Sequence, residues 1–278
     1  MKVLLIDISN LTMRCLFSQM PGPEETEFSI FKLTFMASFT KLIKTLEPDR
    51  VICVQDSESW RKKVYPEYKA NRAAKRDQSV VNFDAFFPVM EKFFEMLSGS
   101  FKNIPFVKVP QAEADDIIAT IVKNHPEWDI INVSSDRDFY QMFRYPNYRQ
   151  YDGMKHMFIE GLDPNVELMV KIITGDSSDN IPGLKRGVGP KRALKIINED
   201  VNQWIDDEKL QDEYARNMKL ISFDCIPKEI EISINTVINN LTYGELDTKK
   251  YFKFIQMSGL AELMNTFTDY VNLLKKVH

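Results

Sequence analysis

Nine carboxylates recur along the chain in short clusters, and most of them follow strand-like apolar runs or open helix-like ones. Acidic side chains that come together without nearby His or Cys ligands repel one another unless hard cations such as Mg²⁺ lie between them. The pattern therefore predicts an acidic centre that binds metal ions. Its members are Asp7, Asp56, Glu113, Asp115, Asp116, Asp136, Asp138, Asp176 and Asp179.

Two of these acids follow buried-strand patterns. Asp7 lies at the end of the apolar run of residues 2–8, and Asp56 follows that of residues 50–54. Ligands bind at the carboxyl ends of strands in open parallel sheets, so parallel strands would place both acids at one edge. The simpler interpretation of either residue alone is a helix N-cap.

A third cluster, Ala-Glu-Ala-Asp-Asp at residues 112–116, opens a helical pattern. Acids in a first turn commonly complement the helix dipole. Glu113 and Asp116 share a helix face, whereas Asp115 lies well around the helix and reaches the same site only if the first turn lies alongside it. The spacing thus permits two or three metal ligands.

The remaining acids lie in extended or loop segments. Asp136 and Asp138 alternate along a segment that leaves a strand, so they lie on one side of it. The same D-x-D pattern occurs in sugar-nucleotide transferases and in many turns. Asp176 and Asp179 belong to Gly-Asp-Ser-Ser-Asp, a composition that also suits a loop with Asx turns.

The glycine pair Gly187 and Gly189 forms a more specific pattern. Paired glycines let backbone N–H groups approach a phosphate, and a helix opening at Pro190 would direct its positive end at the same anion. Lys191 and Arg192 add charge. This is the arrangement of a helix-hairpin-helix element, expected at about residues 175–197, which holds a nucleic-acid backbone without reading bases. A plain turn between two helices is the alternative.

Two segments carry a net positive charge, although the net charge of the whole chain is −4. Residues 60–76 hold seven basic residues and one acid, and residues 180–198 hold five basic residues and no acid. Such runs are either solvated faces or arms that hold a polyanion. Lys69 and Arg72 are three residues apart, so they would project from one helix face in a segment that covers the acidic centre.

The elements that must position these side chains alternate between strands and helices. Ser9 and Asn10 offer N-caps for a helix from about Leu11. The alternation predicts an α/β fold with a mostly parallel central sheet wrapped by helices, followed by a helical part from about Pro164. A compact two-part molecule is expected, divided into residues 1–163 and 164–278. Strand patterns cover residues 2–8, 50–54, 106–109 and 129–133, and helical patterns cover 28–46, 83–97 and 112–123.

The composition is that of an ordinary intracellular globular chain of 278 residues. Its three cysteines lie far apart without C-x-x-C spacing, and its three histidines are equally dispersed, so neither a disulfide framework nor a zinc or haem site is indicated. No stretch approaches the ~18 apolar residues of a membrane span. We therefore expect a cytoplasmic protein without a membrane partner.

Taken in order, these motifs resemble the flap endonuclease/5′-3′ exonuclease family, and most closely bacteriophage 5′-nucleases and the 5′-nuclease domain of bacterial DNA polymerase I. The resemblance runs from Asp7 to about Ile197. Besides Asp7, Asp56 and residues 112–116, it rests on Pro-Glu-Tyr-Lys-Ala-Asn-Arg (66–72), Ser-Ser-Asp-Arg-Asp (134–138) and Thr-Gly-Asp-Ser-Ser-Asp-Asn-Ile-Pro-Gly-Leu-Lys-Arg-Gly-Val-Gly-Pro-Lys-Arg-Ala (174–193).

The resemblance implies a structure-selective 5′-nuclease that hydrolyses branched, flapped or nicked DNA, RNA/DNA hybrids included, by a two-metal-ion mechanism. All nine carboxylates would hold Mg²⁺ or Mn²⁺, directly or as neighbours of direct ligands, and K⁺ would lie at the glycine hairpin. Lys69 and Arg72 would be catalytic residues on a helical arch at about residues 57–82. The implied DNA contacts are Arg14, Arg61, Lys63, Lys69, Arg72, Lys185, Gly187, Gly189, Lys191 and Arg192.

The resemblance further suggests a monomer in a bacterial or phage-infected cell, with a replication protein bound through the C-terminal part. Ile8 and Ser57 stand where the family often has Gly after each Asp, which puts only fine backbone geometry in doubt. Two other classes remain. A haloacid-dehalogenase-type phosphatase usually needs a second Asp where Ser9 stands. A catalytically inactive DNA-binding or recruitment module of the same fold is the stronger rival.

Overall fold

Six strands form one sheet at the centre of the molecule, in the order β3-β2-β1-β4-β5-β6. The computed structural model describes residues 1–18, 28–161 and 163–277. Strands β1 to β5 run parallel to their neighbours, and β6, at the edge, is antiparallel to β5. This confirms the predicted α/β class. The strands are β1 (Lys2–Asp7), β2 (Arg50–Gln55), β3 (Phe106–Lys108), β4 (Asp129–Val133), β5 (Tyr148–Asp152) and β6 (Met157–Phe158).

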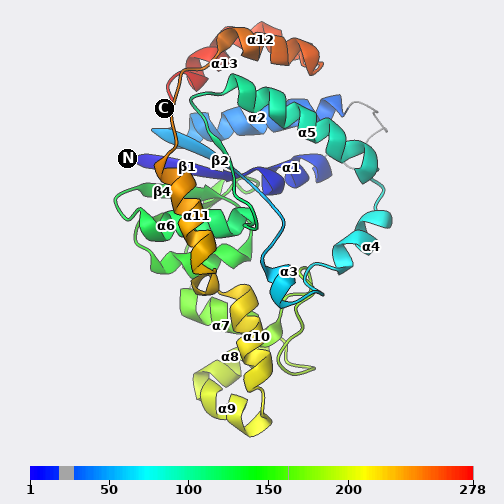
Figure 1. Cartoon of the computed structure of the whole chain (residues 1–278), viewed down its shortest axis with the longest axis vertical. Coiled ribbons are helices and arrows are strands. Elements are labelled where there is room, and N and C mark those ends of the chain that lie inside the picture. Colours follow the sequence, from blue (N-terminus) through cyan, green and yellow to red (C-terminus); the bar gives the residue numbers. More distant parts are fainter. Residues whose placement is uncertain (19–27, 162, 278) are drawn as a thin grey trace.

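Helices cover both faces of the sheet (Figure 1). One face is covered by α1 (Ile8–Phe17), α2 (Ser29–Leu46), α5 (Phe83–Ser100), α12 (Thr248–Met257) and α13 (Phe267–Leu274). Phenylalanine dominates this layer. The ring of Phe93 in α5 lies edge-on to that of Phe35 in α2, with centroids 5.8 Å apart, and 5.1 Å from that of Phe254 in α12. The last helices therefore complete the core that the first ones begin.

The opposite face is covered by α6 (Ala114–Asn124), the 3-10 helix η1 (Arg137–Arg144) and α11 (Lys228–Asn239). Residues Val3 and Leu5 of β1 are fully buried here against Ile117 and Ile121 of α6. Because β1 carries apolar residues on both sides, its sequence reads as an unbroken apolar run, as a doubly covered parallel strand requires.

A helical part extends from this second face, formed by α7 (Pro164–Thr174), α8 (Pro190–Glu199), α9 (Val201–Glu208) and α10 (Gln211–Ile221), and it lies at the bottom of Figure 1. Short 3-10 helices follow at Phe223–Cys225 (η2) and Ala261–Thr266 (η3). The expected division at residues 163 and 164 stays a prediction, because α11, α12 and α13 share hydrophobic clusters with the first half of the chain.

Between β2 and α5 the chain leaves the sheet and returns to it through α3 (Arg61–Val64) and α4 (Asn71–Asp77), along the right side of Figure 1. This segment lies within the expected arch at residues 57–82. Lys69, however, precedes α4 and has a left-handed backbone (φ 59°). The expectation that Lys69 and Arg72 share one helix face is therefore wrong, although both flank the same turn.

A second correction concerns the start of α1. The carboxylate of Asp7 accepts a hydrogen bond from the backbone N–H of Asn10 at 2.9 Å, so Asp7 is the N-cap and the helix begins at Ile8. The expected caps, Ser9 and Asn10, lie inside the helix because the strand turns directly into it. None of the helices in the described ranges is long and apolar enough to cross a membrane.

Candidate metal centre and nucleic-acid interface

A first group of carboxylates gathers at the carboxyl edge of the sheet. Asp7 ends β1 and Asp56 follows β2, and these two strands pair in parallel, so both acids lie at the same edge as predicted. A carboxylate oxygen of Asp56 accepts from the backbone N–H of Ala114 at 2.8 Å. This bond fixes the end of β2 to the start of α6, which carries Asp115 alongside.

Asp136 joins this group from the neighbouring strand β4. Its segment is held from behind by Gln150 of β5, whose buried side-chain amide donates to the carbonyl oxygens of Ser134 at 2.9 Å and Asp136 at 2.8 Å. The Asp136 carboxylate in turn accepts from the backbone N–H of Asp138 at 3.0 Å and begins η1. The buried Gln150 of β5 thus positions Asp136, which follows β4.

Three acids of this group have raised pKa values. Burial raises the pKa of Asp7 to about 7, and the negative charges of Asp56 and Asp136 add to the rise. Burial also raises the pKa of Asp115, with Asp136 and Asp7 as the next causes. Burial raises the pKa of Asp136 although the ammonium of Lys171 opposes it. Asp7, Asp115 and Asp136 therefore keep a proton to higher pH than an ordinary Asp, and a cation beside them would oppose this.

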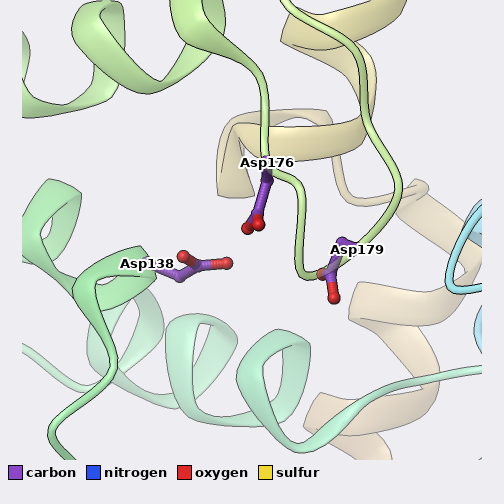
Figure 2. Close-up of side chains that lie close together, drawn as sticks. All are labelled: Asp138, Asp176 and Asp179. Carbon is purple, nitrogen blue, oxygen red and sulfur yellow. The ribbon is translucent and has the colours of Figure 1, made fainter. Parts of the chain in front are cut away.

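A second group lies beside the first and consists of Asp138, Asp176 and Asp179 (Figure 2). One carboxylate oxygen from each lies within 4.8 Å of those of the other two. In Figure 2, Asp138 points from η1 toward Asp176 and Asp179, which are carried by the loop after α7. The two acids of the D-x-D motif therefore belong to different groups: Asp136 lies in the first group and Asp138 in the second.

The loop that carries Asp176 is shaped by backbone pairing and by one glycine. Asp176 and Ile181 exchange two backbone hydrogen bonds of 2.8 Å. Gly175 adopts φ 72°, and a Cβ at this position would lie 2.4 Å from the Ile181 carbonyl oxygen. Only glycine fits this close approach without strain. The side chain of Asp176 accepts from the N–H of Ser178 at 2.7 Å, which closes the expected Asx turn.

Lys171 of α7 enters this second group, and sequence reasoning missed it. Its ammonium contacts the carboxylate of Asp138 and lies 2.8 Å from that of Asp176. Burial would raise the pKa of Asp176, but Lys171 outweighs it and the pKa falls to about 2. The sequence signal was weak, because a lysine five residues before Asp176 on an amphipathic helix looks like any surface lysine.

The third acidic motif divides between two roles. Asp116 is fully buried, and its oxygens accept from the guanidinium of Arg61 at 2.8 and 3.0 Å and from the indole N–H of Trp60 at 3.2 Å. Asp116 also accepts from the N–H of Glu113 in a capping box. Its expected role in metal binding stays a prediction, and the contacts describe a residue that anchors the base of the arch to α6.

Arg61 differs from the expected role as a DNA contact. It is 3% exposed, and its guanidinium donates to Asp116, to Glu113 at 3.1 Å and to the carbonyl oxygen of Leu220 at 2.7 Å. A basic run predicted exposure, but the acids of α6 and the end of α10 enclose this one member. Arg61 therefore stabilises the buried acids instead of reaching a phosphate.

Lys69 and Arg72 reach the acidic centre from the arch. Lys69 contacts Glu113 and lies 3.7 Å from Asp179, while Arg72 lies 2.7 Å from Asp179. Burial would raise the pKa of Glu113, but Lys69 and Arg61 outweigh it and bring the pKa to about 2. The buried hydroxyl of Tyr68, also missed from the sequence, donates to Glu113 or Asp179, at 2.8 and 3.0 Å.

The glycine hairpin lies between α7 and α8. Gly187 adopts φ 80°, and Gly189 is the N-cap of α8, with Pro190 in the first turn. No atom among the described residues lies within 4 Å of a Cβ built at either glycine, so the backbone is open on that side. Lys191 and Arg192 are exposed at the start of α8. The placement is compatible with the predicted phosphate contact.

Other predicted DNA contacts have protein partners. Lys185 forms an ion pair with Glu208, and Lys63 donates to the side-chain oxygen of Gln111. Arg14, in α1, is half-buried and lies 3.4 Å from a carboxylate at the end of β5. These contacts leave the predicted roles untested. The Lys185–Glu208 pair is partly exposed, and solvent-exposed ion pairs contribute little to stability and exchange readily.

The donor set suits hard divalent cations. Two adjacent groups supply only carboxylate oxygens, and the pKa rises of Asp7, Asp115 and Asp136 show that like charge accumulates here. Carboxylates without His or Cys are the ligands that Mg²⁺ and Mn²⁺ prefer. The first group would hold one ion, and the second would hold another where the ammonium of Lys171 now contacts its acids.

A family model described as "5′-3′ exonuclease, N-terminal resolvase-like domain" matches residues 2–172. Over 294 residues the chain is 27% identical to ribonuclease H of Enterobacteria phage T4, covering 96% of this chain and 95% of the relative. It is 29% identical over 209 residues to the flap endonuclease Xni of Shewanella sp. (strain MR-4), covering 70% of this chain and 74% of the relative.

Among solved structures, the chain shares its fold with the D15 flap endonuclease of bacteriophage T5 in a complex with DNA and metal ions. The TM-score is 0.67 at 22% identity, with 93% of this chain and 100% of that chain covered. The T5 D15 protein co-crystallised with metal ions gives 0.64 at 23% identity, with 87% and 100% covered. The family model spans more than half of the chain, and the chain therefore belongs to the 5′-3′ exonuclease family.

Proposed function

We propose that the protein is a divalent-metal-dependent, structure-selective 5′-nuclease that hydrolyses phosphodiester bonds in flapped, branched or nicked DNA and removes RNA primers from RNA/DNA hybrids. One observation carries the proposal: two adjacent carboxylate groups lie at the carboxyl edge of a parallel sheet, with Lys69 and Arg72 beside them, in a chain of the 5′-3′ exonuclease family.

The metal ligands fall into two sets. Asp7, Asp56, Asp115 and Asp136 would hold one Mg²⁺ or Mn²⁺ ion, and the three acids of Figure 2 would hold another. When bound, the ions would activate water for attack and neutralise charge on the leaving oxygen. Glu113 and Asp116 complete the acidic centre by fixing the basic side chains of the arch.

Lys69 and Arg72 would stabilise the charge that develops on the phosphate in the transition state. In the structure they pair with Glu113 and Asp179, so a phosphate entering the centre would exchange one anionic partner for another. Their place on the arch, directly over the acids, supports this role. Arg14 and Lys63 would hold phosphates of the same strand near the cut.

The duplex beyond the cut would lie on the α7–α8 hairpin. A helix-hairpin-helix element there would present Gly187, Gly189, Lys191 and Arg192 to the backbone, and the same hairpin would hold K⁺, whose positive charge would favour a nearby phosphate. Lys185 would contribute after leaving Glu208. The T5 flap endonuclease, which shares the fold, is a protein crystallised with DNA and metal ions, which supports DNA as the substrate class.

The proposal extends to the setting of the reaction. Relatives come from bacteria and from a phage, so we place the activity in the cytoplasm of a bacterial or phage-infected cell. We further propose a monomer that binds a replication protein through its C-terminal part. Light scattering in solution tests the first, and binding assays of the full chain with purified replication proteins test the second.

A cleavage assay tests the function itself. The protein, incubated with a 5′-flapped duplex labelled at the 5′ end, should release labelled products with Mg²⁺ or Mn²⁺ but much more slowly with Ca²⁺, and not at all after exhaustive chelation. Full activity in chelator contradicts the metal mechanism. Tight binding of the flap without cleavage in either metal would instead identify the inactive DNA-binding module.

A further inference from the structure

A cavity of about 360 Å³ lies beside the carboxylate centre, between α1, α2 and the turn that joins β5 to β6. Its basic side chains are those of Arg14, Lys41 and His156, and its hydroxyl groups come from Ser18, Ser38, Tyr151 and two threonines of α2. None of the described residues that line it is Asp or Glu. In a chain with 40 acids and a net charge of −4, this local excess of cations is selective for an anion.

Arg14 is poorly compensated in this cavity. Its Nε atom is buried and has no hydrogen-bond partner among the described residues. The ion pair with Asp152 is long, at 3.4 Å, and involves only the terminal Nη2 atom. Burial lowers the pKa of Arg14 even though Asp152 opposes the shift. Burying a cation whose N–H donor has no acceptor is unfavourable in free energy. An anion bound in the cavity would offset this penalty by accepting from that donor.

Lys41 and His156 form the opposite wall. The Nζ atom of Lys41 lies 3.0 Å from Nε2 of His156. An ammonium can only donate, so Nε2 accepts and the proton of the neutral ring lies on Nδ1. Lys41 keeps two further N–H donors, and no carboxylate within the described residues forms an ion pair with it. Both sides of the cavity therefore present N–H donors.

The position of the cavity relates it to the carboxylate centre. Helix α1 runs from its N-cap Asp7 to Arg14, a rise of roughly 10 Å. Asp152 ends β5 and Gly153 follows it, and the carboxyl end of β5 lies next to that of β4 in the parallel sheet. The cavity thus lies on the α1–α2 face, whereas α7 and the glycine hairpin extend from the α6 face. The carboxylate centre lies between them.

We propose that this cavity is a subsite for one backbone phosphodiester of the nucleic-acid substrate, on the side of the cut opposite the α7–α8 hairpin, with Lys41 and His156 as previously unassigned binding residues. The inference rests on the proposed function, in which Arg14 holds a phosphate of the substrate strand near the cut. The cavity volume lies at the lower end of the range for small-ligand pockets, which suits one nucleotide unit.

The first experiment measures binding, so it does not depend on cleavage. A 5′-flapped duplex is titrated with wild-type protein, Lys41→Ala, and the matched control Lys44→Ala in Ca²⁺ at several salt concentrations. Lys44 is an exposed lysine on the same helix, one turn away and outside the cavity. Lys41→Ala should bind roughly tenfold more weakly and lower the slope of log K against log[salt] by about 0.9. Lys44→Ala should match wild type.

The substrate phosphate that occupies the cavity is identified by replacing the phosphodiesters, one at a time, with uncharged methylphosphonates. One position should weaken wild-type binding by a larger factor than it weakens binding by Lys41→Ala or His156→Gln, because substitutions that remove the same interaction are not additive. If no position shows this coupling, or if Lys44→Ala behaves like Lys41→Ala, the subsite is refuted.

The second experiment needs neither cleavage nor duplex binding, so failure of the proposed function does not decide it. The chain has three histidines, and ¹⁵N-histidine labelling gives three ring spectra, assigned for His156 with His156→Gln. A thymidine dinucleotide with one phosphodiester should shift the His156 signals of wild type but not of Lys41→Ala. If inorganic phosphate shifts them and the dinucleotide does not, the cavity binds a terminal phosphate and the phosphodiester assignment is wrong.

Discussion

The ammonium nitrogen of Lys171 lies 2.8 Å from a carboxylate oxygen of Asp176 and also contacts Asp138. Lys171 thus supplies a cation to two of the three acids drawn in Figure 2, while Lys69 and Arg72 pair with the third, Asp179. A divalent ion that uses the oxygens of Asp138 and Asp176 would have to displace the Lys171 ammonium or share them with it. The metal affinity proposed for the second group would therefore depend partly on a lysine that is not a ligand.

We expect Lys171→Met to bind Ca²⁺ about tenfold more tightly at its weaker site, because the competing positive charge is gone. Isothermal titration calorimetry on chelator-treated protein measures this. Lys195→Met, which removes an exposed lysine of α8, is the control and should leave the affinity unchanged. An affinity that is equal in Lys171→Met and wild type would mean that ammonium and metal do not compete.

Asp136→Asn and Asp176→Asn should both abolish or strongly reduce cleavage, yet they should differ in metal-free stability. Burial and a neighbouring acid raise the pKa of Asp136, so neutralising it should raise the free energy of unfolding. Asp176 instead pairs with Lys171, and its replacement should lower that free energy. Urea unfolding in chelator measures both. Equal shifts of the same sign would contradict the assignment.

Lys69→Ala and Arg72→Ala should reduce turnover by about 10²–10³-fold while changing duplex affinity much less, if their interactions strengthen in the transition state. Single-turnover rates measured beside binding titrations in Ca²⁺ separate the two effects. Lys62→Ala, in the same basic run, is the control, since Lys62 is exposed and forms no ion pair within the described residues. A loss confined to affinity would make Lys69 and Arg72 simple phosphate anchors.

The hairpin prediction concerns the salt dependence of DNA binding. Lys191→Ala/Arg192→Ala should lower the slope of log K against log[salt] by up to ~2, since each phosphate that the protein no longer neutralises removes ~0.9. Binding should weaken equally for all base sequences. Shortening the duplex until it no longer reaches α8 should have the same effect on wild type. If the slope stays at its wild-type value, residues 187–189 form only a turn between helices.

Metal-free stability should depend on pH in two opposite ways. The pKa of Asp7 rises from 3.8 to about 7 on folding, so its folded form holds a proton that the unfolded chain has lost, and stability falls as pH rises from about 4 to 7. The pKa of Glu113 falls from 4.5 to about 2, so its contribution is complete above pH 4.5 and is lost toward pH 2. The free energy of unfolding should therefore peak at about pH 4–5.

Urea unfolding in chelator at several pH values measures this profile. Asp7→Asn should flatten the decline above about pH 5, and saturating Ca²⁺ should reverse it, because a bound cation removes the repulsion that raises the pKa. A metal-free stability that increases from about pH 5 to 7 would contradict the electrostatic account of the first carboxylate group.

The sequence predicted the strands and the edge at which the acids meet, because parallel strands covered on both faces leave long apolar runs that end where the polar ligands begin. Strand β5 was not predicted from the sequence. Its sequence, Tyr148–Asp152, is mostly polar, and the side-chain N–H groups of its buried Gln150 donate to two carbonyls of the neighbouring segment. A buried polar residue with tertiary partners leaves no periodic signal.

The same limit explains the misassigned arginine and the missed lysine. Arg61 belongs to a basic run whose other described members are mostly exposed, and it differs from them through distant partners such as Asp116, 55 residues away. Lys171 lies within the amphipathic helix α7, where nothing in the neighbouring sequence marks it as special. Its acidic partner Asp138 belongs to a different element, η1. Local patterns predict which segments form elements, whereas ion pairs across elements depend on the packing of the whole chain.

The packing of Phe93 against Phe254 has a consequence for the order in which the protein folds. A ribosome delivers the N-terminal sheet and its first helices long before α12. Until residues 248–257 emerge, the phenylalanine layer on that face of the sheet lacks its outer cover. The core of this nuclease therefore closes only when nearly the whole chain has been made, and the nascent protein carries an exposed aromatic surface through most of its synthesis.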